Sequence, residues 1–265
     1  MTKLATFPKR RPYTFAFLVA LVVITIGSTV FLSAGYRIGP SLSIVKIGTL
    51  VIDDLKPGSS IFIDETESLT STGGSESVTL LPGSHRIIVS QGTNQPWNEL
   101  VTIVSDGTTH VRPIFVERHP KERVLDAKEA QRAFSLMWST MLPTKEKPLT
   151  MAGGCASVYA RQNRVIAEVA SSTSCTVPEY LCQNGVCNPT IIFSANEEIT
   201  SVLAFPKRDD ALIIATKDRA FVLELDPRQP AFFAPLTHGD NVHVLPWTAQ
   251  SIVVTTGNEA HEIPL

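Results

Sequence analysis

The longest hydrophobic stretch of the chain lies near its start. Residues 15–34 read FAFLVALVVITIGSTVFLSA, and no charged residue occurs between Arg11 and Arg37. About 20 apolar residues in a helix, at about 1.5 Å per residue, can cross the roughly 30 Å hydrocarbon core of a bilayer. The pattern therefore predicts one transmembrane helix over residues 15–34, preceded by a short tail over residues 1–14.

A cleaved signal peptide is the alternative interpretation of this stretch, because Leu32-Ser33-Ala34 ends in a small residue. Its apolar core, however, is longer than the usual run of about 7 to 15 residues, and Leu32 stands where a small residue is expected. These two features favour an uncleaved membrane anchor.

After this stretch, the chain changes to short runs rich in Val, Ile and Thr, several of which alternate in polarity. Turn residues such as Pro57-Gly58 and Pro82-Gly83 separate the runs, as expected where an antiparallel chain reverses. The segment from Tyr36 to Val45, broken by Gly39-Pro40, is expected to be a short spacer. The pattern predicts a small antiparallel β-sandwich over residues 48–116, with strands at 48–53, 59–64, 76–81, 85–90, 98–104 and 109–116.

A single convincing helical pattern follows the sandwich. Asp126 and Glu129 have the spacing of a capping box, in which the two side chains satisfy exposed backbone N–H groups at the helix start. Apolar residues recur at helical spacing and Pro143 ends the pattern. We expect a connector helix over residues 121–142 that packs on a β domain; a helix that binds a partner is the alternative.

The last part of the chain repeats itself. Residues 206–225 and 246–265 superpose at an offset of 40 residues, and each consists of a strand, a polar turn and a second strand. An earlier hairpin, residues 158–169, matches the first of these at an offset of 56. A period near 40 is typical of β-propeller blades, but three units are fewer than the usual minimum of about four. The fold class is therefore mainly β, with an incomplete, blade-like β-meander over residues 151–265.

Charge indicates how the chain is oriented and which partners it has. Lys3, Lys9, Arg10 and Arg11 precede the apolar stretch without any acidic residue, so the positive-inside tendency places the N-terminus in the cytoplasm and the later domains outside. The formal net charge is −2, and the first 35 residues carry +4, which leaves −6 for the rest. This balance argues against nucleic acid as a partner.

The cysteines number four, at positions 155, 175, 182 and 187. An even number outside the cytoplasm favours disulfides. Asn184-Gly185 predicts a tight hairpin turn that brings Cys182 opposite Cys187, with their Cα atoms about 4.5 Å apart. Cys155 and Cys175 are then left to pair with each other. A zinc site is the alternative, although its ligands would lack the usual C-x-x-C spacing.

Catalytic chemistry has no clear signature in the sequence. The six histidines are scattered and lack the i, i+4 pattern of a metalloprotease helix, and the Gly-Ser pairs lack the G-x-S-x-G elbow. Asp64 to Glu67 lacks the spacing of a calcium loop and is expected to be solvated, and Lys207 to Asp210 is expected to be a charged turn tip. We predict no catalytic residue, no metal site and no cofactor.

Three tryptophans allow two interpretations. If they were exposed, Trp97 and Trp247 could contact carbohydrate or protein, with Trp138 as a further candidate. Large aromatic side chains more often pack in cores, so the sequence favours that role for all three.

Residues 48–116 also resemble a known family. GTLVIDDLKPGSSIFID, SVTLLPGSHRIIVS and QPWNELVTIVSDGTTHVRPIFV are similar to a PEGA domain, a small extracytoplasmic β-sandwich of bacterial and archaeal envelope and surface-layer proteins. The motif that gives the family its name is reduced to one position here, Gly58, with Lys56, Pro57 and Ser59 around it. The resemblance implies a fold and an extracytoplasmic location, and it brings no catalytic residues.

These observations lead to one main expectation about function. The chain is expected to be a single-pass protein of the cytoplasmic membrane that displays non-catalytic binding or structural domains to an envelope polymer or an envelope protein. A sensor subunit that needs a separate signalling partner is one alternative, because the short N-terminal tail cannot hold an output domain. A membrane-anchored hydrolase is another, and it would require a catalytic cleft that sequence periodicity does not reveal.

Overall fold

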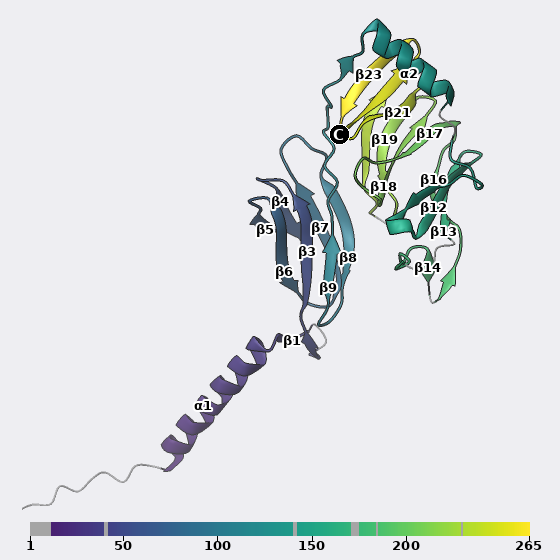
Figure 1. Ribbon diagram of the computed structural model, residues 1–265. Helices are drawn as coiled ribbons and strands as arrows, with labels where there is room; N and C mark the ends of the chain where they lie inside the picture. The colour runs from purple at the N-terminus through teal and green to yellow at the C-terminus, as the bar shows by residue number, and fades with distance from the viewer. Residues whose placement is uncertain (1–11, 40–41, 140–141, 171–174, 184, 229) are drawn as a thin grey trace, which may run out of the picture. The chain divides into compact units, whose positions relative to one another are not determined.

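The computed structural model describes residues 12–39, 42–139, 142–170, 175–183, 185–228 and 230–265 (Figure 1). The fold is mainly β, with an N-terminal apolar helix, a second helix and several antiparallel sheets, as the sequence predicted. Two compact units are distinguished. The first comprises the described residues of Met1–Asp53, Ser75–His85 and Thr102–Val111, and the second those of Asp54–Gly74, Arg86–Val101 and Arg112–Leu265.

The first unit begins with helix α1 (Pro12–Ser33). Its window Ala16–Ser33 has a mean hydropathy of 2.4 and no buried residue, so the helix is long and apolar enough to cross a membrane. Two short strands follow, β1 (Tyr36–Ile38) and β2 (Ile44–Lys46), and they pair as an antiparallel hairpin. The expectation of a simple spacer over these residues was wrong, because the backbone hydrogen bonds of the two strands are made with each other.

Residues 48–111 form two sheets. One has three strands in the order β6-β3-β9, namely β6 (Gly74–Leu80), β3 (Gly48–Leu55) and β9 (Thr108–Val111). The other has four in the order β5-β4-β7-β8, namely β5 (Thr66–Thr70), β4 (Ser60–Ile63), β7 (Gly83–Ser90) and β8 (Trp97–Ile103). Burial alternates along β3 and β4, so each strand presents one face to a core.

Two details of this region correct the sequence prediction. Strands β3 and β9 pair in parallel, although an all-antiparallel arrangement was expected, because alternating polarity does not reveal pairing direction. The last strand ends at Val111, whereas the sequence predicted that it would extend to residue 116. Residues 64–67 are exposed, as expected of a solvated loop, and Asp64 and Glu65, both with positive φ, form the turn into strand β5.

The remainder of the second unit contains three four-stranded antiparallel sheets, which we call the first, second and third repeat sheets. The first comprises β11 (Leu149–Met151), β12 (Ala156–Arg161), β13 (Arg164–Val169) and β16 (Thr190–Ser194), with a single 3-10 turn, η1 (Ala152–Gly154). The second comprises β17 (Ile199–Ala204), β18 (Ala211–Thr216), β19 (Arg219–Glu224) and β20 (Phe233–His238). The third comprises β21 (His243–Thr248), β22 (Ser251–Thr256), β23 (Glu259–Pro264) and β10 (Arg123–Val124).

The repeat read from the sequence is confirmed at its centre. Strands β18 and β19 have the same bounds as β22 and β23 after a shift of 40 residues, and each pair forms an antiparallel hairpin. The earlier hairpin, β12 with β13, requires a shift of 55, one fewer than expected. Pro206 and Pro246 do not correspond, because the former follows β17 and the latter lies within β21. Membership of a β-propeller goes beyond these three sheets and stays a prediction.

Helix α2 (Ala127–Ser139) covers one face of the third repeat sheet. Asp126 Oδ1 accepts hydrogen bonds from the backbone N–H groups of Lys128 and Glu129, and Glu129 Oε2 accepts one from Asp126, so the predicted capping box is present. The helix is shorter than the expected residues 121–142, because Arg123 and Val124 pair with β23 as strand β10. Residues 140–141 lie outside the described part of the chain.

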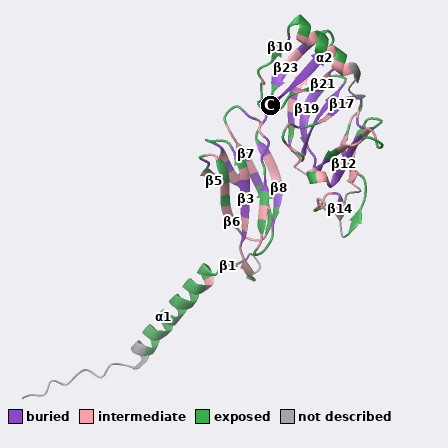
Figure 2. Ribbon diagram, viewed as in Figure 1, coloured by how far each residue is buried: buried purple, intermediate pink, exposed green. Residues whose placement is uncertain are grey.

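Two buried clusters hold the repeat region together (Figure 2). One lies between the first and second repeat sheets and includes Val158, Val165, Leu212 and Phe221, each with at most 1% of its surface exposed. The other lies between the third repeat sheet and α2, and it consists of Leu125, Ala133, Leu245, Val253 and Ala260 with flanking residues of the helix. Strands β18 and β22 are buried on both faces over nearly their whole length, which explains their continuous apolar sequence.

Candidate functional site

A cavity of about 540 Å³ lies in the second unit beside the disulfide hairpin. A volume in this range is typical of small-molecule sites, which run from about 300 to 1,000 Å³. Its lining mixes apolar side chains with amide, hydroxyl and phenol groups, and Arg228 is its one charged side chain. The lining residues are Tyr180, Leu181, Val186, Asn188, Thr190, Pro227 and Arg228. We call this space the hairpin cavity.

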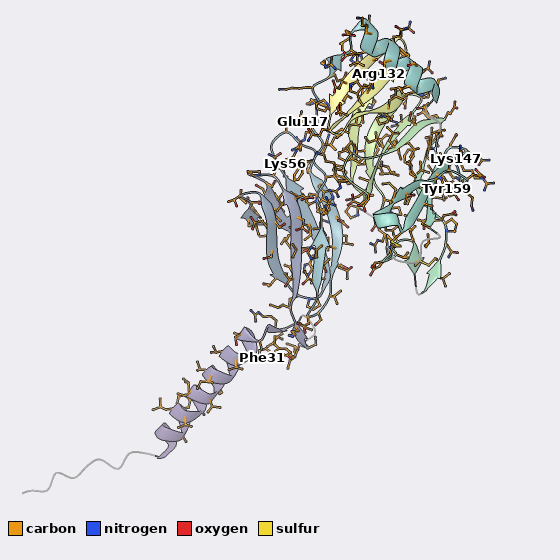
Figure 3. The ribbon with its side chains drawn as sticks, viewed as in Figure 1. Phe31, Lys56, Glu117, Arg132, Lys147 and Tyr159 are labelled. Carbon is orange, nitrogen blue, oxygen red and sulfur yellow. A yellow bond between two sulfur atoms is a disulfide. The ribbon has the colours of Figure 1, made fainter. Side chains whose placement is uncertain are left out.

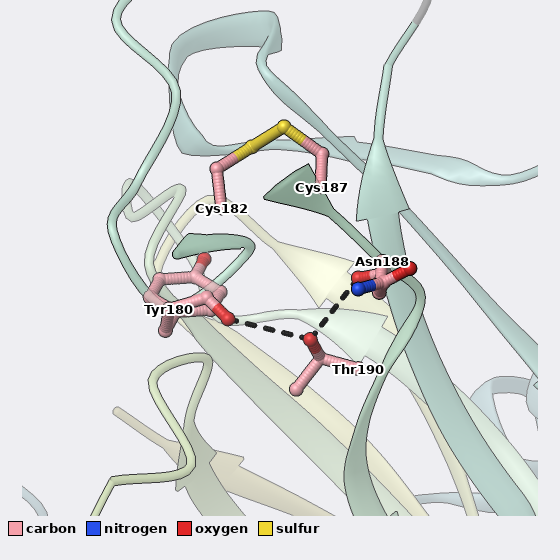
Figure 4. The surroundings of a disulfide bond; sticks show 5 residues. All are labelled: Tyr180, Cys182, Cys187, Asn188 and Thr190. Atoms are coloured by element: carbon pink, nitrogen blue, oxygen red, sulfur yellow. Dashed lines mark hydrogen bonds between the residues drawn. A yellow bond between two sulfur atoms is a disulfide. The ribbon is translucent and has the colours of Figure 1, made fainter. Parts of the chain in front are cut away.

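One wall of the hairpin cavity comes from the segment that joins β13 to β16 in the first repeat sheet. This segment contains a two-stranded hairpin, β14 (Cys182–Gln183) with β15 (Val186–Cys187), in which Cys182 is directly opposite Cys187. Below the disulfide, the backbone N–H of Asn188 donates to the carbonyl of Leu181 over 3.2 Å. The Thr190 hydroxyl donates to the carbonyls of Tyr180 and Asn188, each over 3.3 Å (Figure 4). Both legs of the hairpin are therefore held in place.

The opposite wall comes from the short segment between β19 and β20 of the second repeat sheet, which carries Pro227 and Arg228. The Arg228 guanidinium forms a salt bridge to Asp226 over 2.5 Å, and it contacts Glu179 of the other wall over 3.3 Å. About half of the Arg228 side chain is exposed. This ion pair joins the two walls and neutralises the cation, so the cavity does not attract anions strongly.

Both predicted disulfides are present in the structure. Cys182 pairs with Cys187 and their Cα atoms are 4.0 Å apart, close to the spacing expected for opposed residues of a tight hairpin. The turn residue Asn184 lies outside the described part of the chain, and Gly185 has a φ of +78°, which glycine adopts without strain. Cys155 pairs with Cys175, and Cys155 is almost fully buried, whereas Cys187 is exposed. One disulfide is therefore part of the core and the other part of a surface hairpin.

The phenol of Tyr180, in the lining of the hairpin cavity, has a raised pKa. Burial raises the pKa of the Tyr180 phenol above its ordinary value, and the carboxylates of Asp226 and Asp210 raise it further, while Arg228 has a smaller opposing effect. The phenol therefore stays protonated at neutral pH, so Tyr180 can donate a hydrogen bond to a ligand and is a poor base.

Two glutamates of the second unit have strongly raised pKa values. Burial and the carboxylate of Glu224 raise the pKa of Glu99 to about 8. Burial raises the pKa of Glu224 to about 7, although hydrogen bonds from Trp97 Nε1 at 2.9 Å and from the backbone N–H of Phe232 oppose the rise. Because their pKa values lie near 7 and 8, Glu99 and Glu224 are partly or mostly protonated at neutral pH. Burying a protonated carboxyl costs less free energy than burying a carboxylate.

The segment Lys207 to Asp210 forms the charged turn expected from the sequence, between β17 and β18, and part of it is fixed to neighbouring segments. Only 9% of the Arg208 side chain is exposed. Its guanidinium donates to the backbone carbonyls of Arg112 and Pro113 over 2.6 and 2.9 Å, and it pairs with Asp210 over 2.6 Å. Asp209 accepts from the backbone N–H of Gly153 over 2.6 Å. Arg208 and Asp209 therefore fix this turn to two other segments of the chain, one at Arg112-Pro113 and one at Gly153.

The tryptophans differ in their surroundings. Trp97 is completely buried, as its core interpretation requires, so it presents no surface to carbohydrate. Trp247 is half buried beside α2, with the Arg132 guanidinium 5.1 Å from the centre of its ring (Figure 3). The side chain of Trp138 lies outside the described part of the structure. Contact with a partner thus stays a prediction for Trp247 and for Trp138.

The comparison with known proteins identifies no relative. No protein-family model matches the chain, and no curated protein matches it either.

The sequence reasoning found the disulfide hairpin but missed the cavity beside it. Tyr180, Thr190 and Arg228 belong to no motif, and they come from two segments about 40 to 50 residues apart. One signal was available: the segment from 170 to 189 is longer than its counterpart in the second repeat sheet, residues 225–232. Among the described residues, no group of three or more His, Cys, Asp or Glu side chains could hold a metal ion. The cavity is suited to binding through neutral hydrogen bonds and apolar contact.

Proposed function

We propose that this chain is a single-pass protein of the cytoplasmic membrane that holds a non-catalytic binding module on the outer side, where it binds a component of the cell envelope. The PEGA-like reading of residues 48–116 belongs to this proposal. The apolar helix, the basic residues before it and the two disulfides support the topology, since disulfides persist outside the cytoplasm.

The observation that carries the proposal is the hairpin cavity. It combines a protonated phenol, an amide and a hydroxyl with an apolar wall, a composition suited to neutral polar ligands such as the hydroxyl- and amide-bearing groups of an envelope polymer. Its lining offers no side chain activated as a nucleophile, since the phenol stays protonated and Thr190 donates to backbone carbonyls. Binding is therefore the activity that this chemistry supports best.

The test measures binding of the full-length protein, in detergent, to isolated envelope polymer. Arg228→Ala should weaken binding severalfold, because it removes a side chain that lines the cavity and the ion pair that joins the two cavity walls; an ion pair this exposed is worth about 0.2 to 1 kcal/mol, and 1 kcal/mol corresponds to about fivefold.

A matched control is available on the same sheet. Arg219 is similarly exposed and also contacts two carboxylates, Asp218 and Glu197, but it does not line the cavity. Arg219→Ala should bind as the unchanged protein does. If both variants bind equally well, the cavity is not the binding site. Turnover of envelope substrates by two independent preparations would contradict the non-catalytic proposal.

A further inference from the structure

The hairpin β1–β2 follows the apolar helix without a linker. Helix α1 ends at Ser33 and strand β1 begins at Tyr36. The hairpin pairs Tyr36 with Lys46 and Ile38 with Ile44, and the backbone N–H of Ile47 donates to the carbonyl of Gly35 over 2.9 Å. The hairpin is therefore fastened directly to the end of the helix.

The side chains of this hairpin are unusually apolar for an exposed element. Ile38, Leu42 and Ile44 are 65%, 85% and 66% exposed, and Tyr36 is 39% exposed. Single exposed apolar residues are common on protein surfaces, but four within nine residues form a continuous patch that usually marks an interaction site.

An apolar groove lies between the hairpin and the last turns of α1. It has a volume of about 560 Å³ and is lined by Gly27, Ser28, Phe31, Leu32 and Ile38. The rings of Phe31 and Tyr36 stack at one end of it with their centres 5.4 Å apart, and Figure 3 labels Phe31 in this part of the helix. The small side chains of Gly27 and Ser28 leave the space open, because a Cβ on Gly27 would meet no atom within 4 Å.

Arg37 is a charged residue beside the last turn of α1. Arg37 Nη1 donates to the carbonyl of Leu32 in the last turn of the helix over 3.0 Å and to the carbonyl of Tyr36 in β1 over 2.9 Å, so it ties the helix end to the hairpin. Its position beside an apolar groove is typical of arginines at a bilayer interface, where the stem lies in hydrocarbon and the guanidinium reaches the headgroups.

Distances decide where the hairpin lies when the helix spans the membrane. The 18-residue apolar window is about 27 Å long at 1.5 Å per residue, close to the roughly 30 Å hydrocarbon core, so Ser33 is at its edge. Three residues further on, Tyr36 is at most about 10 Å away. The headgroup layer is roughly 5 to 7 Å thick on each side. The hairpin therefore starts within or directly above this layer.

We propose that the β1–β2 hairpin lies in the outer membrane–water interface and that the groove beside it holds an acyl chain of a phospholipid from the same leaflet. The bilayer is the occupant because the exposed patch is continuous with the membrane-spanning surface of α1. This inference rests on the proposed topology. It makes strands β1 and β2 part of the membrane contact, and it would restrict how freely the following sheets move relative to the bilayer.

The experiment uses the full-length protein in phosphatidylcholine vesicles with a nitroxide label on one introduced cysteine. All four native cysteines are in disulfides, so only the introduced thiol reacts. Collision of the label with oxygen, which concentrates in lipid, is compared with collision with a water-soluble nickel chelate. Labels at Ile38→Cys and Leu42→Cys should show a severalfold higher ratio of oxygen to nickel collision than a label at Val124→Cys. Val124 is a matched control, because it is apolar and 67% exposed but belongs to strand β10.

One further label and one further substitution distinguish the ways in which the inference could fail. A label at Val23→Cys, in the centre of α1, reports whether the helix is in the bilayer at all. If Val23 is in lipid while Ile38 and Leu42 behave like Val124, the hairpin inference is wrong and the anchor stands; if Val23 is in water, the topology itself is wrong. Filling the groove with Gly27→Leu should lower oxygen collision at Ile38 and leave Leu42 unchanged. An unchanged value at Ile38 would overturn the lipid-filled groove.

Discussion

The first and second repeat sheets contain the same central hairpin but differ in the segment that leads to their fourth strand. In the second sheet, residues 225–232 make this connection directly. In the first sheet, residues 170–189 make it, and they add the disulfide hairpin. The core between the two sheets is shared, with Phe221 of β19 packed between Phe193 and Phe233.

The repeated hairpins and the inserted segment 170–189 are stabilised in different ways. In the second sheet β18 is buried along its whole length, and in the first sheet Val158 and Val165 are buried in the shared core, which leaves both hairpins little freedom to vary. The inserted segment is held by disulfides and backbone hydrogen bonds, and its Leu181 reaches the shared core. A binding cavity can form there without disturbing the repeated framework.

The largest effect expected from this comparison concerns the shared core. Phe221→Ala should lower the free energy of unfolding by about 3 to 5 kcal/mol, because a fully buried aromatic ring leaves a cavity between two sheets. Denaturant unfolding of the full-length protein in mild detergent measures it. Phe233→Ala is the control in the same aromatic cluster, and it should cost less because Phe233 is 48% exposed. Equal losses would show that the rings do not pack as described.

Removing each of the two disulfides should affect stability and binding to different extents. Replacing Cys155 and Cys175 by serine removes a link across 20 residues, which costs about 3 kcal/mol by the loop-entropy estimate, whereas the link between Cys182 and Cys187 spans 5 residues and is worth about 2 kcal/mol.

Binding should follow the opposite order at temperatures where both variants are folded. Loss of the second link frees the hairpin that carries Leu181 and Val186, both of which line the cavity, so that variant should bind envelope polymer more weakly. Melting curves and a binding measurement on the same samples test this. If binding instead followed stability, the cavity would not be the site of contact.

The last expected effect is a pH dependence that arises beside the second repeat sheet. The folded-state pKa of Glu99 is raised to about 8 from an ordinary 4.5, so the unfolded chain loses this proton first as pH rises. Stability should therefore fall between about pH 4.5 and pH 8, and level off above it, where both states are ionised.

Glu99→Gln should remove this contribution and flatten the stability profile over that range. Glu259→Gln, at an exposed carboxylate of the third repeat sheet, is the control and should leave the profile unchanged. A profile for Glu99→Gln that is as steep as that of the unchanged protein would assign the pH dependence to Glu224, whose pKa is also raised.

Local patterns alone were enough to predict much of this molecule. The apolar helix, the capping box at Asp126 and the 40-residue repeat depend on residues close together in sequence, where spacing fixes which side chains share a face. The pairing of Cys182 with Cys187 is also local, because a two-residue turn dictates the register of its strands.

Tertiary structure alone decided the features that involve distant segments. The parallel pairing of β3 with β9 joins strands separated by about 60 residues, and the pairing of β10 with β23 brings together Arg123 and Glu262, which are 139 positions apart. Arg208 and Lys207 have the same appearance in sequence, yet only Arg208 reaches the backbone carbonyls of Arg112 and Pro113 and becomes buried. The walls of the hairpin cavity come from two repeat sheets in the same way. Such contacts depend on how the sheets pack, and no periodicity within one segment encodes which distant segment will lie beside it.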